Sequence, residues 1–237
     1  MSAHRQAFFR GVLASVPFVI VIVPFGVLFG VVATDAGMTP WEVLAFSLVV
    51  IAGAAQFAAV QLMNEGAPLL IVLVTSIAVN LRMAMYSAAL TPHLGGAPGW
   101  QRAIMAYFLV DQSFAAASAE FAKRPDQSLS EKVTFYFGAV APVCPLWYAA
   151  SYGGAVFGKA IPPEYALDFA VPIAFLAITA PMLRTRAHVA AAVVSVSVAL
   201  ALVWMPYSTG LLVAAAAAMA TGAAVELHDE RRAARRT

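Results

Sequence analysis

The chain has 237 residues, of which 62% are hydrophobic and only 11% are charged, and its mean hydropathy is +0.83. Soluble domains carry about 25% charged residues, so this composition excludes a soluble globular domain and indicates a polytopic all-α membrane protein lying in a lipid bilayer. The net charge of +2 gives no sign of a nucleic-acid partner, and the single cysteine, Cys144, excludes an intramolecular disulfide.

Eight apolar segments of about 18 to 25 residues are long enough to cross a bilayer as helices. The first is too long for the apolar part of a signal peptide and contains Pro17 and Pro24, so we expect a transmembrane helix there. Eight spans place both termini in the cytoplasm; a seven-span alternative merges the last two segments or makes them re-entrant. The expected spans are 11–33, 42–62, 68–90, 101–121, 133–158, 166–183, 187–205 and 208–225.

The basic residues support this orientation, because lysine and arginine are enriched in cytoplasmic loops. With the N-terminus inside, 11 of the 14 basic residues lie on the cytoplasmic side, and only Arg102 and Lys159 lie outside. The remaining basic residue, Arg82, lies within the third span. We expect residues 226–237 to form a charged cytoplasmic tail.

The chain also shows a repeated pattern of glycine and proline, which predicts two parallel copies of four spans, 8–121 and 134–225, within one transport domain of residues 1–237. Duplicated halves and interrupted helices are typical of secondary transporters. The alternative is that such residues are simply common in packed membrane helices. The repeat predicts helix breaks or hinges at Pro17, Pro24, Gly26, Gly30, Pro142 and Pro145.

The third span carries Asn80, Arg82 and Tyr86. An arginine near the bilayer centre costs roughly 2.5 to 3.5 kcal/mol on insertion scales, so Arg82 needs a partner. Asn80 and Arg82 point about 200° apart on a helix, so this span is expected to be central in the bundle or unwound near Asn80. Asp111 in the fourth span is the only carboxylate far from a predicted span end. At about 1.5 Å per residue, Arg82 lies about 12 Å and Asp111 about 15 Å below the outer ends of their spans. We therefore expect the two charges to meet between antiparallel neighbouring helices.

These polar residues have a functional and a structural interpretation. Ionisable residues inside a membrane are functional candidates by default, and Asp111 is the best candidate for a coupling proton site. The alternative is that Arg82 and Asp111 form a purely structural ion pair. Gln56 can coordinate the polar end of a substrate, or it can join two helices by a hydrogen bond.

No pattern for catalysis or for a cofactor stands out. The four histidines lie far apart at segment ends, which indicates no metal site. The glycine-rich stretch 153–160 lacks the Ser or Thr that completes a phosphate loop, so a nucleotide site is not expected. We therefore expect neither an enzyme nor a bound cofactor.

Three motifs occur in order along the chain: Gly53-Ala-Ala-Gln-Phe57, Asn80-Leu-Arg82-x3-Tyr86-Ser-Ala-Ala-Leu90-x-Pro92 and Asp111-Gln-Ser-Phe114. From about Phe8 to Ala224 the chain resembles the AzlC family of azaleucine-resistance and branched-chain amino-acid export proteins. The resemblance implies the large subunit of a two-component exporter in the bacterial cytoplasmic (inner) membrane, with a small AzlD-like membrane partner. Family members commonly have Thr-Asp-Glu where this chain has Val110-Asp111-Gln112, so it lacks a second acid there.

The residues suit an amino-acid substrate. A zwitterion with an aliphatic side chain needs donors for its carboxylate, acceptors for its ammonium group and an apolar pocket. Arg82 and Asn80 can provide the donors, and Asp111 and Gln56 the acceptors. A channel, an exporter of another small solute and a non-transporting scaffold are the alternatives, and a homo-oligomer is compatible with each. The predicted substrate-binding residues are Gln56, Asn80, Arg82, Tyr86, Asp111 and Ser113.

Overall fold

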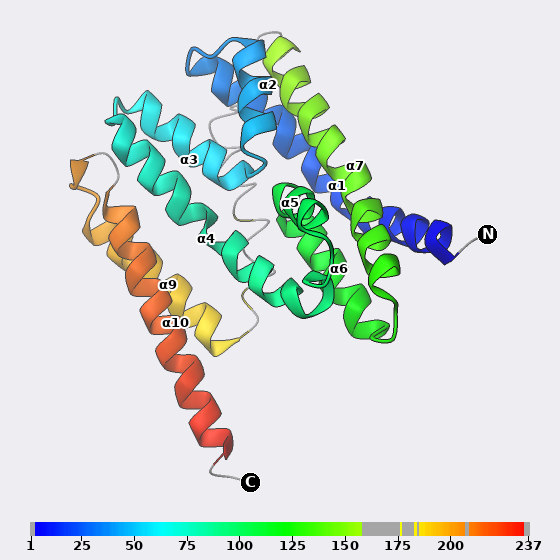
Figure 1. Cartoon of the computed structure of the whole chain (residues 1–237). Coiled ribbons are helices and arrows are strands. Elements are labelled where there is room, and N and C mark those ends of the chain that lie inside the picture. The colour runs from blue at the N-terminus through cyan, green and yellow to red at the C-terminus, as the bar shows by residue number, and fades with distance from the viewer. Residues whose placement is uncertain (1–2, 158–175, 177–182, 184, 207–208, 235–237) are drawn as a thin grey trace. The chain divides into compact units, whose positions relative to one another are not determined.

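The computed structural model describes residues 3–157, 176, 183, 185–206 and 209–234 (Figure 1). Its described elements are all helices, which confirms the all-α prediction for this part of the chain. The sixth expected span, 166–183, lies almost entirely outside the described residues, as do Gly158 and Lys159. The helices are α1 (Ala3–Asp35), α2 (Pro40–Val49), α3 (Gly53–Asn64), α4 (Leu69–Leu94), α5 (Gly99–Tyr107), α6 (Asp111–Lys123), α7 (Leu129–Phe157), α9 (Arg186–Ala201) and α10 (Gly210–Ala234).

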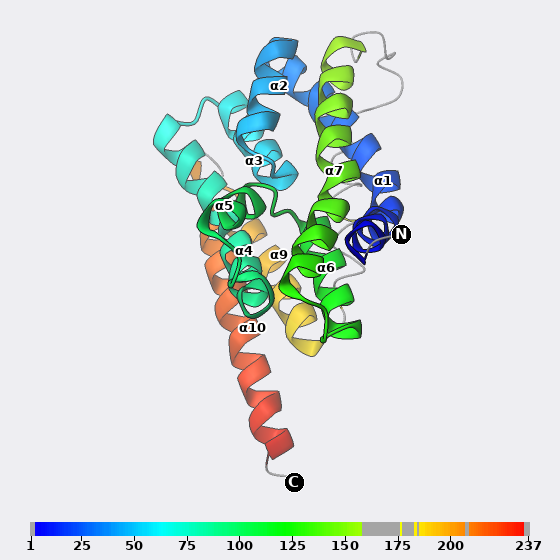
Figure 2. The same ribbon diagram turned by 45° about the vertical axis from the view of Figure 1, so that its right-hand side comes forward.

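The chain divides into two compact units. The first comprises residues 1–60 and 79–165, and it contains every predicted substrate-binding residue. The second comprises 61–78 and 166–237, where α9 and α10 pack side by side (Figure 2). The first part of the expected tail continues the α10 helix as far as Ala234.

Four described helices are long and apolar enough to cross a membrane: α1, α4, α7 and the Gly210–Asp229 part of α10. Their length and hydropathy support a multi-pass membrane protein. Two shorter apolar helices, α2 and α9, are each too short to cross about 30 Å of hydrocarbon alone. The predicted total of eight spans counts residues 42–62 and 101–121 as crossings, whereas the structure breaks each of these segments into two short helices.

The α1–α7 pair forms the tightest contact of the first unit (Figure 1). Gly11 lies against residues 135–139 and Gly30 against residues 151–155. A Cβ added at Gly11 or Gly30 would lie 2.2 Å or 2.1 Å from a backbone oxygen of α7, so only glycine permits this approach. Because the contacts advance in the same direction along both helices, α1 and α7 run parallel.

The prolines of these two helices do not interrupt them. Both helices remain continuous, so the expected helix breaks are wrong, while a hinge motion stays a prediction. Proline removes one backbone hydrogen bond and can kink a helix without ending it, and here each helix is packed along its length against the other. The helix continues through every position at which we expected a break: Pro17, Pro24, Gly26, Gly30, Pro142 and Pro145.

The second expected span is a helical hairpin instead of a straight helix. Residues 50–52, between α2 and α3, are not helical. Ser47 and Gln56 would lie about 13 Å apart along a straight helix. Gln56 Nε2 nevertheless donates a hydrogen bond to Ser47 Oγ at 3.2 Å. The chain therefore folds back sharply at residues 50–52, and we call α2 and α3 the first hairpin.

The fourth expected span is a second hairpin, formed by α5 and α6 around the non-helical residues 108–110. Met105 and Ser113 would lie about 12 Å apart along a straight helix. The hydroxyl oxygen of Tyr136 instead lies 2.8 Å from the Met105 carbonyl oxygen and 3.4 Å from Ser113 Oγ. Both arms of the second hairpin therefore meet at one side chain of α7.

The direction of α6 also differs from expectation. Tyr86 of α4 packs on Phe114, and His93, about two turns later, packs on Phe121. The partners advance together, so α6 runs parallel to the second half of α4, and the expected antiparallel crossing is wrong. A nine-residue α5 and a thirteen-residue α6 are each too short to cross a bilayer.

The second hairpin starts at the end of the unit where α1 and α7 begin. Pro98 and Gln101 line one surface hollow together with Phe8 and Leu129. Arg102 therefore lies at that end, whereas the sequence placed it outside with the N-terminus inside. With the predicted orientation, N-terminus inside, Arg102 would join the basic residues of the cytoplasmic side. The error arose because hydropathy treats a hairpin of about 20 apolar residues as a crossing.

Candidate functional site

An ion pair joins α4 to the tip of the second hairpin. Arg82 Nη1 lies 3.1 Å from Asp111 Oδ2. Tyr86, one helical turn after Arg82, donates its hydroxyl hydrogen to Asp111 Oδ1 at 2.9 Å. Both carboxylate oxygens are thus held from α4, and the predicted meeting of the two charges is confirmed.

The backbone of the hairpin sets the position of Asp111. It is the first residue of α6, directly after the non-helical turn, and a carboxylate at a helix N-terminus is stabilised by the helix dipole. The ring of Tyr86 stacks on Phe114 with centroids 4.1 Å apart and an interplanar angle of 8°. This stack orients the phenol that donates to Asp111.

The cluster has unused capacity for hydrogen bonds. Asn80 Oδ1 and Arg82 Nε are buried and have no hydrogen-bond partner among the described residues. The α4 helix is continuous through Asn80, so the unwinding considered there is not observed. The side chains of Arg82 and Asp111 are 33% and 40% exposed. Buried polar atoms without partners are uncommon in folded proteins, so a ligand or water is the natural partner for these two.

Ser113, predicted as a substrate ligand, is fully buried and bonds the turn of the second hairpin. The Val110 amide donates to Ser113 Oγ at 3.0 Å, and Ser113 Oγ lies 3.2 Å from the Phe108 carbonyl oxygen. The hydroxyl group of Ser113 is thus engaged with backbone groups of the turn. The structure therefore gives Ser113 a supporting place beside Asp111, and direct contact with a substrate stays a prediction.

Gln56, also predicted as a substrate ligand, is fully buried in the first hairpin. Gln56 Nε2 donates a hydrogen bond to Ser47 Oγ, and Gln56 Oε1 has no partner among the described residues. The next residue, Phe57, packs on two rings of α1: its ring centroid lies 4.8 Å from that of Phe25 and 5.4 Å from that of Phe29. Gln56 forms no hydrogen bond with Asn80, Arg82 or Asp111.

The tips of the two hairpins are in direct contact. Tyr107, the last residue of α5, donates its hydroxyl hydrogen to the carbonyl oxygen of Leu48 near the end of α2. Leu48 lies in the last turn of its helix, where backbone carbonyls lack helical partners. The polar cluster around Asp111 thus lies beside a junction of two interrupted helices, an arrangement that transporters use for their substrate sites.

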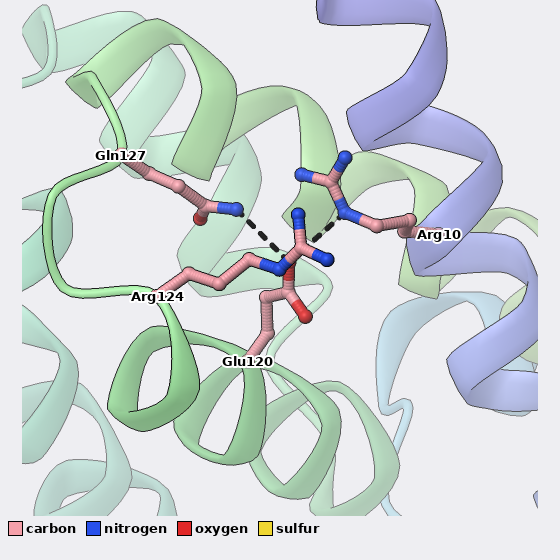
Figure 3. Close-up of polar contacts among 4 residues, drawn as sticks. All are labelled: Arg10, Glu120, Arg124 and Gln127. Carbon is pink, nitrogen blue, oxygen red and sulfur yellow. Dashed lines mark hydrogen bonds and ion pairs between the residues drawn. The ribbon is translucent and has the colours of Figure 1, made fainter.

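A second charged cluster lies at the other end of α6 and was missed by the sequence analysis (Figure 3). Glu120 Oε1 accepts hydrogen bonds from Arg10 Nε at 3.0 Å and from Gln127 Nε2 at 2.9 Å. Arg124 Nε lies 3.7 Å from the same oxygen. Arg10 and Glu120 are 110 residues apart, so no sequence spacing could have indicated their contact. The cluster ties the start of α1 to the end of α6.

Residues 17–161 match the family model described as AzlC protein. The chain belongs to the AzlC family. The AzlC match covers all of the predicted substrate-binding residues and both hairpins.

Two relatives illustrate the similarity. The chain is 30% identical over 175 residues to "Inner membrane protein YgaZ" of Escherichia coli (strain K12), covering 71% of this chain and 70% of that protein. It is 29% identical over 229 residues to an "Uncharacterized membrane protein" of Archaeoglobus fulgidus, covering 92% of this chain and 94% of that protein. No solved structure matches the chain significantly. The membrane relatives and the long apolar helices together establish a multi-pass membrane protein.

Proposed function

We propose that this AzlC-family protein is a secondary transporter subunit that exports branched-chain or other apolar amino acids across the cytoplasmic membrane. It works with a small AzlD-like membrane subunit and uses the electrochemical gradient. The observation that carries this proposal is the ion pair of Arg82 and Asp111, which lies at the tip of a helical hairpin and has unpaired polar atoms beside it.

The chemistry of the pair matches both charges of an amino acid. Arg82 contacts Asp111 through Nη1, and its Nε has no partner among the described residues, so Nε is left to donate to a substrate carboxylate. Asp111 can accept the substrate ammonium group once Arg82 turns to the substrate carboxylate. A zwitterion therefore replaces the direct contact between the two side chains without leaving either charge unpaired.

A purely structural ion pair is the main alternative. A pair kept only for stability needs all of its polar atoms satisfied, because unpaired polar groups in an apolar environment are costly. Arg82 Nε and Asn80 Oδ1, which have no partner in the part of the chain that the structure describes, instead favour a site that binds a ligand.

Energy coupling follows from the same residues. The sequence has no complete phosphate loop, and Asp111, which pairs with Arg82, is the carboxylate proposed to accept the substrate ammonium group. We propose proton coupling at Asp111. An export rate that ignores both pH and membrane potential would contradict this part of the proposal.

The test is export of labelled leucine, isoleucine and valine from cells with and without this chain, each with and without a small membrane subunit encoded nearby. We expect export to require the chain and to be lost in Arg82→Ala and Asp111→Asn. Arg102→Ala is the matched control, because it removes an exposed arginine outside the cluster. Normal export by folded Arg82→Ala and Asp111→Asn variants would overturn the proposal. Non-saturable downhill flux without counterflow in proteoliposomes would indicate a channel.

A further inference from the structure

The turn of the second hairpin requires partners for backbone groups that two helix ends leave free. The backbone itself satisfies part of this demand. The Phe108 amide donates to the Ile104 carbonyl at 3.1 Å, and the Leu109 amide donates to the Ala106 carbonyl at 3.3 Å. The carbonyl of Met105, which lies between these two, is left for a side chain.

Tyr136 of α7 provides that side chain. Its hydroxyl group donates to the Met105 carbonyl oxygen at 2.8 Å, and its ring is 1% exposed. The hydroxyl oxygen of Tyr136 also lies 3.4 Å from Ser113 Oγ, in the first turn of α6. One buried hydroxyl group thus contacts the last part of α5 and the first part of α6.

Asp111 lies inside the segment that these contacts hold. Val110, immediately before it, donates its amide hydrogen to Ser113 Oγ, two residues after it. The partners of the Asp111 carboxylate are on α4, a different helix. The alignment of Asp111 with Arg82 therefore depends on where the turn is fixed.

Helix α7 can hold this turn in place because it packs closely against α1. Gly138, two residues from Tyr136, lies against the α1 backbone so closely that an added Cβ would be 2.2 Å from the Phe8 carbonyl oxygen. Tyr136 can shift little without separating the two helices, because packed interiors have few alternative positions.

We infer that Tyr136 is a positioning residue, whose hydroxyl group fixes the turn of the second hairpin to α7 and so holds Asp111 in line with Arg82. The transport readout of this inference rests on the proposed function. Tyr136 itself contacts neither the substrate nor the ion pair.

The first test is Tyr136→Phe, which keeps the ring and removes the hydroxyl group. The matched control is Tyr152→Phe, on the same helix, where the ring packs on Trp41 with centroids 5.2 Å apart. In proteoliposome counterflow of labelled leucine, we expect Tyr136→Phe to raise the half-saturation concentration on the order of tenfold, since slight misplacement of a binding group is costly. The maximal rate per folded protein and the Tyr152→Phe control should stay close to the wild type.

A mutant cycle with Ser113→Ala separates positioning from general damage. Ser113 and Tyr136 hold the same turn, so the double variant should be affected much less than the product of the two single effects. Independent, multiplying effects would overturn the inference. So would an unchanged half-saturation concentration in Tyr136→Phe, or a loss confined to the amount of folded protein.

A second measurement is independent of transport and separates failure of this inference from failure of the proposed function. In a Cys144→Ala background, Arg82→Cys and Asp111→Cys are joined by a short bifunctional thiol reagent. We expect Tyr136→Phe to slow this cross-linking severalfold and Tyr152→Phe to leave it unchanged. Equal rates in both would overturn the inference even if the protein transports amino acids. A slowed rate in a protein that shows no transport would support the inference and contradict only the proposed function.

Discussion

The two hairpins of the first unit share a plan, and they differ in chemistry. Each consists of two short helices around three non-helical residues, and each follows a long helix, α1 or α4. In each, a phenylalanine of the second arm packs on a ring of the preceding long helix: Phe57 on Phe29 and Phe114 on Tyr86. The hairpins begin at opposite ends, because the second half of α4 runs toward the end where α1 begins.

The tips of the hairpins differ in charge and exposure. In the first hairpin the polar contact is between neutral side chains, Gln56 and Ser47, and both are fully buried. At the tip of the second hairpin, Asp111 pairs with Arg82 of α4. Both side chains are partly exposed, and Arg82 Nε has no partner among the described residues. A neutral hydrogen bond is an inexpensive way to close a buried turn, whereas a charge inside a membrane is costly. The shared plan of the two hairpins therefore builds the junction, and the second hairpin carries the proposed chemistry.

The largest expected effect is that of Arg82→Ala. Removing one partner of a hydrogen-bonded charge pair costs about 2 to 5 kcal/mol, so we expect the initial rate of amino-acid counterflow to fall on the order of 100-fold. Measurement at equal amounts of folded protein, with Arg102→Ala as the control, checks this. A fall smaller than about threefold would remove the functional difference between the hairpins.

The next largest effect is expected for Glu120, near the end of α6. Its side chain is 13% exposed and accepts from two side chains, with Arg124 also nearby. Because hydrogen bonds to charged groups contribute about 1.5 to 3 kcal/mol each, we expect Glu120→Gln to lower the free energy of unfolding by about 2 kcal/mol. Thermal unfolding in detergent and counterflow by the remaining folded protein measure the two consequences. A changed half-saturation concentration would show that this cluster also takes part in transport.

Tyr86→Phe tests whether the Tyr86 hydroxyl group orients Asp111. This variant removes the hydroxyl group that donates to Asp111 and keeps the ring that stacks on Phe114. Loss of one hydrogen bond to a charged group costs about 1.5 kcal/mol, which corresponds to roughly a tenfold rise in half-saturation concentration. Counterflow at several leucine concentrations gives this value, and wild-type behaviour would exclude a role for Tyr86 in orienting Asp111.

The smallest effect is expected in the first hairpin, for Gln56→Met. The change removes the hydrogen bond to Ser47 and also an unpaired buried oxygen, so the two effects on stability nearly cancel, to within about 1 kcal/mol. We expect the half-saturation concentration to change less than about threefold. A loss of counterflow as large as that expected for Arg82→Ala would place Gln56 in the substrate site and contradict the proposed difference between the two hairpins.

The meeting of Arg82 and Asp111 could be predicted from the sequence because a lone buried charge requires a partner. Few other carboxylates were available inside the apolar segments. The pair forms even though the assumed helix directions were wrong, because the turn of the second hairpin brings Asp111 beside Arg82.

The hairpins could not be predicted in the same way. Hydropathy and length are the same for a crossing and for a hairpin of about 20 apolar residues. Residues 108–110 contain neither glycine nor proline, the usual signals of a break. Two weak signals were present: Arg102 on the wrong side, and the shared pattern of Gln56-Phe57-Ala58-Ala59 and Ser113-Phe114-Ala115-Ala116. The prolines of α1 and α7 predicted helix breaks that do not occur, because mutual packing keeps these long helices intact.

The most direct test of zwitterion binding at Arg82 and Asp111 uses the unaltered protein with its partner in proteoliposomes. Counterflow of labelled leucine is measured against unlabelled leucine, against 3-methylbutylamine, which lacks the carboxylate, and against 4-methylpentanoate, which lacks the ammonium group. Because a site built for paired charges rejects analogues that leave one unpaired, we expect leucine to inhibit at concentrations about 100-fold lower than either analogue. Inhibition by either analogue as strong as that by leucine would contradict the account.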